Sequence, residues 1–198
     1  ASLPIVVQEF IPGDDTVIRF GALYLDEGRV LARFEGRKLR SRPMGHTTIA
    51  VSEPDDQVHA LALRFFEGLN LSGPVSLEIK RDPQGRYWVI EPTVGRTDFW
   101  AGLCAANGVD MTLIEYRAQT RQPLQTPSQR RSHLWMNGER DPGAVLWLLR
   151  HAPAQLLRHR IRGVYASLSD PGPWLLSLGR FLGNLPSRAV RKVSRAVT

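Results

Sequence analysis

The segment from residue 75 to residue 91 constrains the fold most, because apolar and polar residues alternate on both sides of a short turn. Residues 82–85 combine aspartate, proline and glycine, which are the residue types that favour a tight reversal of the chain. The period of two on each side is typical of β-strands, whose side chains point alternately to opposite faces. The segment therefore predicts a β-hairpin with strands at residues 75–81 and 86–91.

Side-chain parity in this hairpin brings two carboxylates together. If residues 82–85 form a four-residue loop, Glu78 faces Val89, and Glu91 lies diagonal to Glu78 on the same face, ~7–8 Å away. The opposite face would then carry the apolar set Val75, Leu77, Ile79, Trp88 and Ile90. Two neighbouring carboxylates repel each other unless a cation lies between them, and Mg²⁺ prefers such oxygen ligands. The pattern leaves two interpretations open, a magnesium site or two solvent-exposed glutamates beside Lys80.

The rest of the first 118 residues predicts an α+β fold. Apolar runs rich in β-branched residues predict strands at residues 3–11, 16–25 and 29–39. Apolar spacing of three and four predicts helices at residues 52–69, 98–106 and 111–118. The expected N-caps of these helices are Ser52, Asp98 and Asp110. We therefore expect an antiparallel sheet with flanking helices, followed by a helical tail.

Charge is distributed unevenly along the chain. Residues 1–118 contain 13 Lys or Arg residues against 16 Asp or Glu, whereas residues 119–198 contain 13 against three. The polar, proline-containing stretch 119–140 is expected to be a linker. Residues 141–198 alternate apolar and Arg-rich segments broken by proline and glycine, which predicts a basic extension of short amphipathic helices.

Cysteine content and the first residues bear on the compartment. Cys104 is the only cysteine, so it cannot form an internal disulfide, and a cytoplasmic location is expected. Neither a signal peptide nor an apolar run of membrane-spanning length is apparent. Because the sequence starts with Ala1 and Ser2 rather than Met, we expect it to be part of a longer natural chain.

Residues 73–92, GPVSLEIKRDPQGRYWVIEP, resemble the metal-binding hairpin of the ATP-grasp superfamily. In that superfamily an acidic residue on one strand is followed by a Glu-x-Asn segment on the next. Glu78 and Glu91 match the two acids, and Thr93 stands where the family has asparagine. The resemblance implies that Glu78, Glu91 and Thr93 bind Mg²⁺, with Thr93 the weakest ligand because a hydroxyl replaces an amide oxygen.

Residues 6–15, VVQEFIPGDD, are similar to the ATP-grasp strand that ends in the hinge over adenine. The resemblance implies that the hinge is formed by Gln8, Glu9, Phe10 and Ile11. Asp15 has the offset of the acidic residue that contacts the ribose. ATP is therefore the implied cofactor, together with Mg²⁺.

Two further segments extend the resemblance. Residues 34–43, FEGRKLRSRP, resemble the basic segment that faces phosphates or the carboxylate substrate, which implies such roles for Lys38 and Arg40. Residues 91–100, EPTVGRTDFW, resemble the superfamily members called carboxylate–amine ligases, and Arg96 would stabilise the developing oxyanion or acyl phosphate.

The resemblance implies an ATP-dependent carboxylate–amine or carboxylate–thiol ligase that acts through an acyl phosphate. ATP-grasp enzymes bind ATP between two subdomains, and the half with the Gly-rich phosphate loop would precede residue 6. No Walker-type phosphate loop replaces it. We therefore expect residues 1–118 to be the C-terminal ATP-grasp subdomain and this chain to be inactive in isolation. The expected substrates are a small-molecule carboxylate and an amine.

Two other interpretations compete with a working ligase. One is a non-catalytic binding module whose Arg-rich tail contacts nucleic acid or an anionic membrane surface. The sequence has no recognisable helix-turn-helix or RNA-binding motif, so the expected partner of such a tail is the membrane. The other is a ligase-like domain that has lost catalysis, for which Thr93 in place of asparagine is the only indication.

Overall fold

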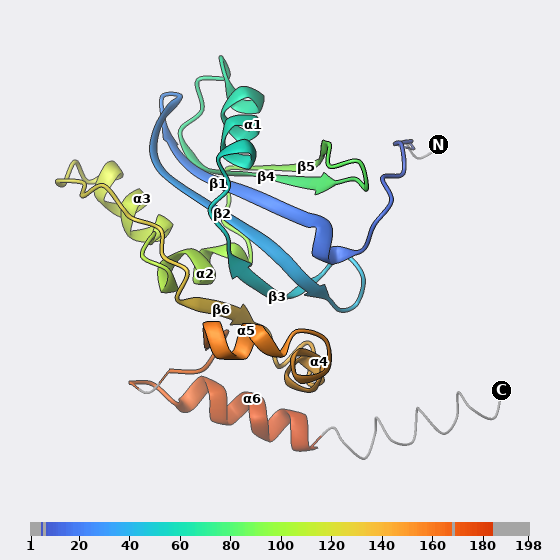
Figure 1. Ribbon diagram of the computed structural model, residues 1–198. Coiled ribbons are helices and arrows are strands. Elements are labelled where there is room, and N and C mark those ends of the chain that lie inside the picture. The colour runs from blue at the N-terminus through green and yellow to red at the C-terminus, as the bar shows by residue number, and fades with distance from the viewer. Residues whose placement is uncertain (1–4, 6, 168, 184–198) are drawn as a thin grey trace.

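One mixed β-sheet forms the centre of the protein (Figure 1). The computed structural model describes residue 5, residues 7–167 and residues 169–183. Within these residues seven strands lie in the order β5-β4-β1-β2-β3-β6-β7. Their bounds are β1 Ile18–Asp26, β2 Arg29–Ser41, β3 Thr47–Ser52, β4 Gly73–Arg81, β5 Tyr87–Val94, β6 His133–Met136 and β7 Arg160–Gly163. Neighbouring strands are antiparallel except β6 and β7, which are parallel.

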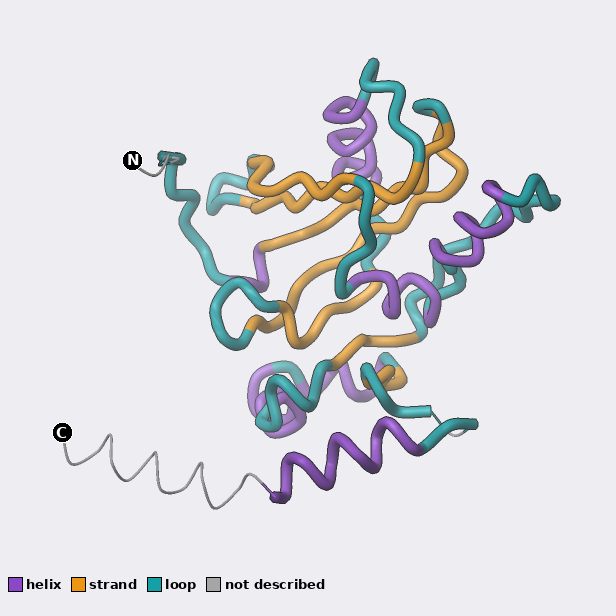
Figure 2. The backbone as a smooth tube through the Cα atoms, turned by 180° about the vertical axis from the view of Figure 1, so that it is seen from behind, coloured by secondary structure: helices purple, strands orange, loops and turns teal. Residues whose placement is uncertain are grey.

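Helices cover both faces of this sheet. Their bounds are the 3₁₀ turn η1 Asp15–Val17, α1 Asp56–Phe66, α2 Trp100–Ala106, α3 Met111–Gln119, α4 Ala144–His151, α5 Pro153–Arg158 and α6 Gly172–Gly183. Along β1, Phe20, Ala22 and Tyr24 pack with α2 and α3, whereas Leu23 and Leu25 pack against α1 on the other face. Helix α4 covers the β3 and β6 end of the α1 face. Figure 2 shows α6 outside the sheet, beyond its β6 and β7 end.

A glycine allows close packing on the α2 face. A Cβ added to Gly36 in β2 would lie 2.4 Å from the Phe20 ring and 2.9 Å from the Val51 carbonyl oxygen. Both distances are well inside van der Waals contact, so only glycine lets the Phe20 ring lie over β2. The ring then stacks on Phe34 and meets Phe99 edge to face.

The structure confirms the predicted hairpin between residues 16–25 and 29–39, but the strand predicted at residues 3–11 is wrong where it can be examined. Residues 5 and 7–11 are not in a strand, while residues 3, 4 and 6 lie outside the described part of the chain. Ile5, Val7 and Phe10 are 85%, 88% and 81% exposed. A strand needs a neighbour for its backbone hydrogen bonds, and no described strand pairs with this segment.

Two of the three predicted helix caps are wrong. Ser52 ends β3, a buried strand that the sequence analysis missed, and α1 instead begins after Asp55, whose carboxylate accepts from the Gln57 and Val58 amides. Asp98 accepts from the Phe99 amide but does not cap α2. The Asp110 cap of α3 is confirmed, because its carboxylate accepts from the backbone amide of Leu113.

The region beyond residue 118 contains both helices and strands. Helices α4, α5 and α6 match the expected short helices, whereas residues 184–198 lie outside the described residues. Strand β6 lies in the stretch expected to be a linker, and β7 lies in the expected helical extension. The domain division at residues 118 and 140 stays a prediction, and the sheet itself continues through β6 and β7.

None of the helices in residues 7–167 and 169–183 combines the length and the apolar character needed to cross a bilayer.

Candidate functional site

The β4–β5 hairpin brings the two predicted acids face to face. Glu78 pairs directly with Glu91 across the hairpin. The predicted diagonal register is wrong, because Val89 pairs with Ile79 and the register shifts between Glu78 and Ile79. Ile90 is the additional residue at this irregularity. Such a bulge places two residues of one strand opposite one of its partner, so the carboxylates share a face through a different register from the one predicted.

The register next to the turn also differs from the predicted one, because Arg81 pairs with Tyr87 rather than with Arg86, and this changes the core side of the hairpin. Trp88 pairs with Lys80 rather than lying on the Ile79 side, so the predicted grouping of Trp88 with the core is wrong. The indole instead donates to the turn residue Asp82, Nε1 to Oδ2 at 2.9 Å. Tyr87 of β5 packs instead against the apolar residues on the α1 face of the sheet.

Asp82 fixes the turn that joins the two acid-bearing strands. Its Oδ1 accepts from the Gln84 and Arg86 backbone amides at 3.0 and 2.8 Å. Its Oδ2 accepts from Arg86 Nε at 2.7 Å and from the Trp88 indole. One carboxylate thus holds both ends of the turn, and the hairpin geometry depends on its charge.

This arrangement predicts a pH dependence. Burial raises the pKa of Asp82, but hydrogen bonds from Trp88 and Arg86 outweigh it and lower the pKa to about 2. Because the folded pKa lies below the unfolded value of 3.8, the stabilisation is present above that value and is lost as pH falls toward about 2. In urea titrations, the stability advantage of wild type over Asp82→Asn should shrink across this window. An advantage that stays constant with pH would contradict the assignment, and the exposed Asp170→Asn is the control.

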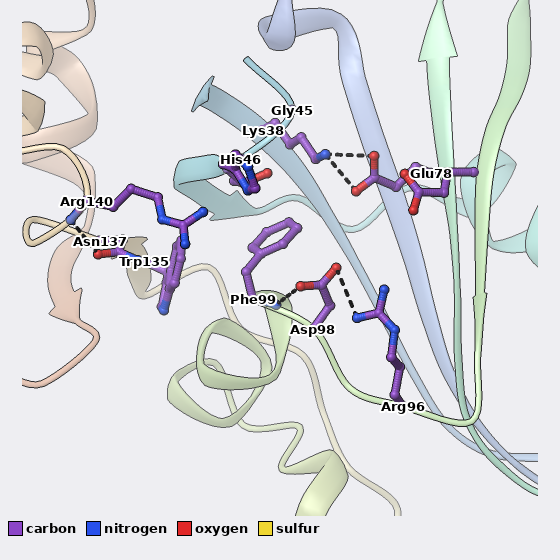
Figure 3. A pocket seen from close by; sticks show the side chains of 12 residues that line it. Lys38, Gly45, His46, Glu78, Arg96, Asp98, Phe99, Trp135, Asn137 and Arg140 are labelled. Carbon is purple, nitrogen blue, oxygen red and sulfur yellow. Dashed lines mark hydrogen bonds and ion pairs between the residues drawn. The ribbon is translucent and has the colours of Figure 1, made fainter. Parts of the chain in front are cut away.

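A pocket of about 500 Å³ opens on the α2 face of the sheet, next to the two acids (Figure 3). Glu78 pairs with Phe20 on β1, and Lys38 pairs with Ala50 on β3, so both acid and base project from this face. The lining residues are Lys38, Gly45, His46, Thr47, Glu78, Glu91, Arg96, Asp98, Phe99, Trp135, Asn137 and Arg140. The pocket therefore collects both charges and aromatic rings from segments far apart in the sequence.

Lys38 and Glu78 form a buried ion pair inside the pocket. Lys38 Nζ lies 2.6 and 2.7 Å from the two Glu78 carboxylate oxygens and 5.5 Å from the centre of the Phe99 ring. Burial raises the pKa of Glu78, the ammonium of Lys38 partly opposes this, and the negative charges of Glu91 and Asp98 add to it. In the described residues no basic side chain forms an ion pair with Glu91. This corner of the pocket therefore favours an additional cation.

The donor set fits Mg²⁺. Glu78 and Glu91 offer two carboxylates on one face, and Mg²⁺ in nucleotide sites is commonly held by one or two carboxylates, with phosphate oxygens and water completing the octahedron. No group of three or more His, Cys, Asp or Glu suited to a metal occurs in the described part of the chain. Thr93, the expected third ligand, is buried opposite Ser76 and does not line the pocket. The geometry thus brings two of the three predicted ligands together.

Comparison with known proteins adds to this geometry. No protein-family model matches the chain. The D-aspartate ligase of Enterococcus faecium (strain Aus0004) is 26% identical over 142 residues, which cover 66% of this chain and 34% of that ligase. The biotin carboxylase of Campylobacter jejuni, solved as a complex with β-γ-ATP, superposes with a TM-score of 0.53 at 14% identity, over 64% of this chain and 30% of that one. The chain has the fold of the ATP-grasp ligases.

The chain spans about a third of the length of each of these ATP-grasp relatives. The superposition confirms the expected fold class, a sheet with flanking helices, although β6 and β7 make the sheet mixed rather than purely antiparallel.

Two of the three predicted catalytic residues lie in the pocket of this ATP-grasp fold. Lys38 comes from β2, and Arg96 from the loop between β5 and α2. Arg96 Nη1 lies 4.0 Å from a carboxylate oxygen of Asp98, a loose pairing that leaves most of the guanidinium free for a ligand.

Arg40, the third predicted catalytic residue, lies outside the pocket. Its Nε pairs with Asp141 Oδ2 at 2.5 Å, and its guanidinium carbon Cζ lies over the Trp147 ring, 5.2 Å from the ring centre. The cause is an irregularity in β2, where Lys38 pairs with Ala50 but Arg40 pairs with Ile49. The extra residue turns Arg40 to the α4 face, although its spacing of two from Lys38 predicts the same face.

The predicted adenine-contacting residues also lie outside this pocket. Gln8, Glu9 and Phe10 are exposed, and Lys80 Nζ lies 5.3 Å from the centre of the Phe10 ring. Asp15 begins η1, and its carboxylate accepts from the Ser41 amide at 2.9 Å. The roles of residues 8–11 and Asp15 toward ATP stay predictions.

One end of the pocket, formed by His46, Trp135, Asn137 and Arg140, was not predicted from the sequence. The available signal was the short apolar run at residues 133–136, HLWM, set between polar stretches. It predicts a strand, but nothing in it says which strand it pairs with. Its pairing with β3 alone brings Trp135 beside Ala50 and carries the following turn to the pocket.

Proposed function

We propose that the chain is the metal-binding part of an ATP-dependent ligase that joins a carboxylate to an amine. The observation that carries this proposal is the Glu78–Glu91 pair, which faces a pocket that also contains Lys38 and Arg96. The ATP-grasp fold and the relative named D-aspartate ligase support the reaction class. They also support an acidic amino acid as a first candidate substrate.

In this proposal Glu78 and Glu91 hold Mg²⁺, which supplies charge neutralisation for the phosphate oxygens of ATP when bound. A carboxylate oxygen of the substrate attacks the γ-phosphorus, and ADP leaves. The amine nitrogen then attacks the acyl carbon of the acyl phosphate, loses a proton, and inorganic phosphate leaves. A thiol in place of the amine follows the same scheme, and an amine is favoured by the reaction class of the relative.

The chain's own residues have separable roles. Lys38 orients the Glu78 carboxylate through two short contacts and keeps its charge compensated when the pocket is empty of cations. Arg96 is placed to stabilise negative charge on the reacting carboxyl group, since its guanidinium lines the pocket and its pairing with Asp98 is loose, at 4.0 Å. Because the pocket excludes residues 8–11, we propose that the nucleotide's base is bound mainly outside it.

The test is ADP formation by the intact natural protein. The rate should require Mg²⁺ and an acid together with an amine, with D-aspartate as the first acid to try. Turnover that is equally fast without Mg²⁺ would contradict the proposed role of the two glutamates. The variant that isolates this role is Glu91→Ala.

A second function, contact with an anionic membrane surface, is favoured by α6. Trp174, Leu175, Leu176 and Leu182 on this helix are each about half exposed. Residues 141–198 contain nine Lys or Arg residues and two Asp residues. Exposed apolar side chains beside basic ones are typical of helices that lie at lipid interfaces.

We expect the whole chain to float with vesicles of phosphatidylserine and phosphatidylcholine, but not with phosphatidylcholine alone. The double variant Leu175→Glu/Leu182→Glu should lose most of the bound fraction, because it replaces two exposed apolar side chains by carboxylates, which the anionic lipid surface repels. Double substitution of the α1 surface residues Leu63 and Phe65 by glutamate is the matched control. Equal flotation of all three proteins would exclude α6 as the contact.

A further inference from the structure

The pocket has a second end, opposite the acid pair. His46 lies in the loop before β3, and Asn137 and Arg140 lie in the turn between β6 and α4. Figure 3 shows Arg140 and Glu78 at opposite ends, with the aromatic side chains between them. The residues at this second end take no part in the proposed metal site, so they are free to bind another part of a ligand.

Arg140 is the uncompensated cation of the pocket. Of the basic side chains that line it, Lys38 pairs with Glu78 at 2.6 Å, and Arg96 lies 4.0 Å from Asp98. Within the described residues the Arg140 guanidinium has no acidic partner. An arginine offers five N–H donors in a planar fork that matches a carboxylate. Arg140 lines the same pocket as Glu78 and Glu91.

The turn that carries Arg140 is held from several sides. Asn137 Oδ1 accepts from the Arg140 backbone amide at 3.1 Å, and the backbone amide of Asn137 donates to the Thr48 carbonyl oxygen at 2.8 Å. The next residue, Asp141, is anchored by Arg40. The backbone at Arg140 is therefore held in place before a ligand binds, so binding has to order only its side chain.

The middle of the pocket is aromatic. The Phe99 and Trp135 rings lie with their centres 5.6 Å apart, and both residues line the pocket. Such a surface suits the carbon chain of a small ligand and provides no charge partner. A ligand that uses the whole pocket therefore carries one anionic group at the Arg140 end and another group at the Glu78 end.

We infer that Arg140, assisted by Asn137 and His46, binds a non-reacting carboxylate of the acid substrate. This rests on the proposed ligase function, and it narrows the substrate to dicarboxylic acids, amino acids with acidic side chains included. One carboxylate lies at the metal end and reacts, while the other forms a charge-assisted, bidentate pair with the guanidinium. Arg140 is a specificity-determining residue and takes no part in phosphoryl transfer.

Ligand binding to the chain itself tests the contact without any turnover. The probe is succinate, followed by ¹H–¹⁵N NMR, with the uncharged diamide succinamide as its shape-matched control. Succinate should shift the signals of Asn137 and Arg140, and Arg140→Gln should weaken its binding about tenfold or more, whereas Arg64→Gln on the exposed surface of α1 should not. Equal affinity of wild type and Arg140→Gln, or equal shifts with succinamide, would overturn the inference.

Kinetics of the intact natural protein separate this inference from the ligase proposal. Arg140→Gln should raise the KM for the acid about tenfold or more, leave the KM for ATP unchanged and change kcat little, with partial recovery in Arg140→Lys. A raised KM for ATP instead would assign Arg140 to the nucleotide and overturn the inference while the ligase stands. The opposite result is also possible to recognise. If succinate binding depends on Arg140 but the intact protein does not turn over ATP, the anion site stands and the ligase proposal fails.

Discussion

Replacing Glu91 by alanine should lower Mg-ATP-dependent ADP formation by the intact natural protein at least about 100-fold, because it removes one of the two protein ligands of the metal. Glu91 is the cleaner of the two acids to change. It is exposed and forms no ion pair in the described residues, whereas a Glu78 variant would leave the ammonium of Lys38 buried without its partner. Loss of activity in Glu91→Ala therefore reports on the site rather than on folding.

The measurement is a coupled assay for ADP at varied Mg²⁺, with thermal unfolding to show that the variant is folded. Glu67→Ala, at an exposed position just after α1, is the matched control and should keep full activity. Higher Mg²⁺ should recover part of the rate in Glu91→Ala if the lost interaction is metal binding. Undiminished activity in this variant would exclude the proposed metal site.

Replacing Asp141 by alanine should destabilise the protein by about 3 kcal/mol, because it leaves the guanidinium of Arg40 without its partner in a mostly buried position. The Asp141 side chain is 2% exposed, and that of Arg40 is 17% exposed. Asp141 Oδ2 also accepts from the Thr48 hydroxyl at 3.3 Å, so the variant loses a second contact. The effect is larger than for a surface ion pair, which is worth about 1 kcal/mol or less.

The free energy of unfolding from urea titrations measures this effect. Glu139→Ala, at an exposed position two residues away in the same turn, is the control and should change the stability little. In a double-mutant cycle, Arg40→Met should cost less in the Asp141→Ala background than in wild type, because the uncompensated charge is then removed. A loss below about 1 kcal/mol for Asp141→Ala would contradict a structural role for the pair.

This ion pair holds Arg40 outside the pocket, although the sequence predicts it beside Lys38 in the site. An arginine two residues after Lys38 looks the same in the sequence whether it binds a ligand or a buried aspartate 101 positions away. The local sequence around Arg40 contains no sign of Asp141. Only the packing of α4 against β2 and β3 brings the two together.

The sequence alone determined the elements whose signals are local. The hairpin with Glu78 and Glu91, the β1–β2 hairpin and the Asp110 cap follow from turn residues, a period of two and capping chemistry within a few positions. These signals depend on residues that are close together in the sequence, so they can be recognised without knowing the fold. The carboxylates share a face as parity predicted, but through a different register, because the pairing next to the turn is shifted by one residue and the bulge at Ile90 then brings Glu91 opposite Glu78.

Tertiary structure alone decided which residues meet across the sheet. The bulges in β2 and β5, the pairing of β6 with β3 and the turn that carries Arg140 all depend on partners far away in the sequence. A bulge costs little locally and is selected by what the two faces of the sheet must contact, which no short window of sequence contains. For this reason the sequence located the acid end of the pocket, while its second end became visible only in the folded chain.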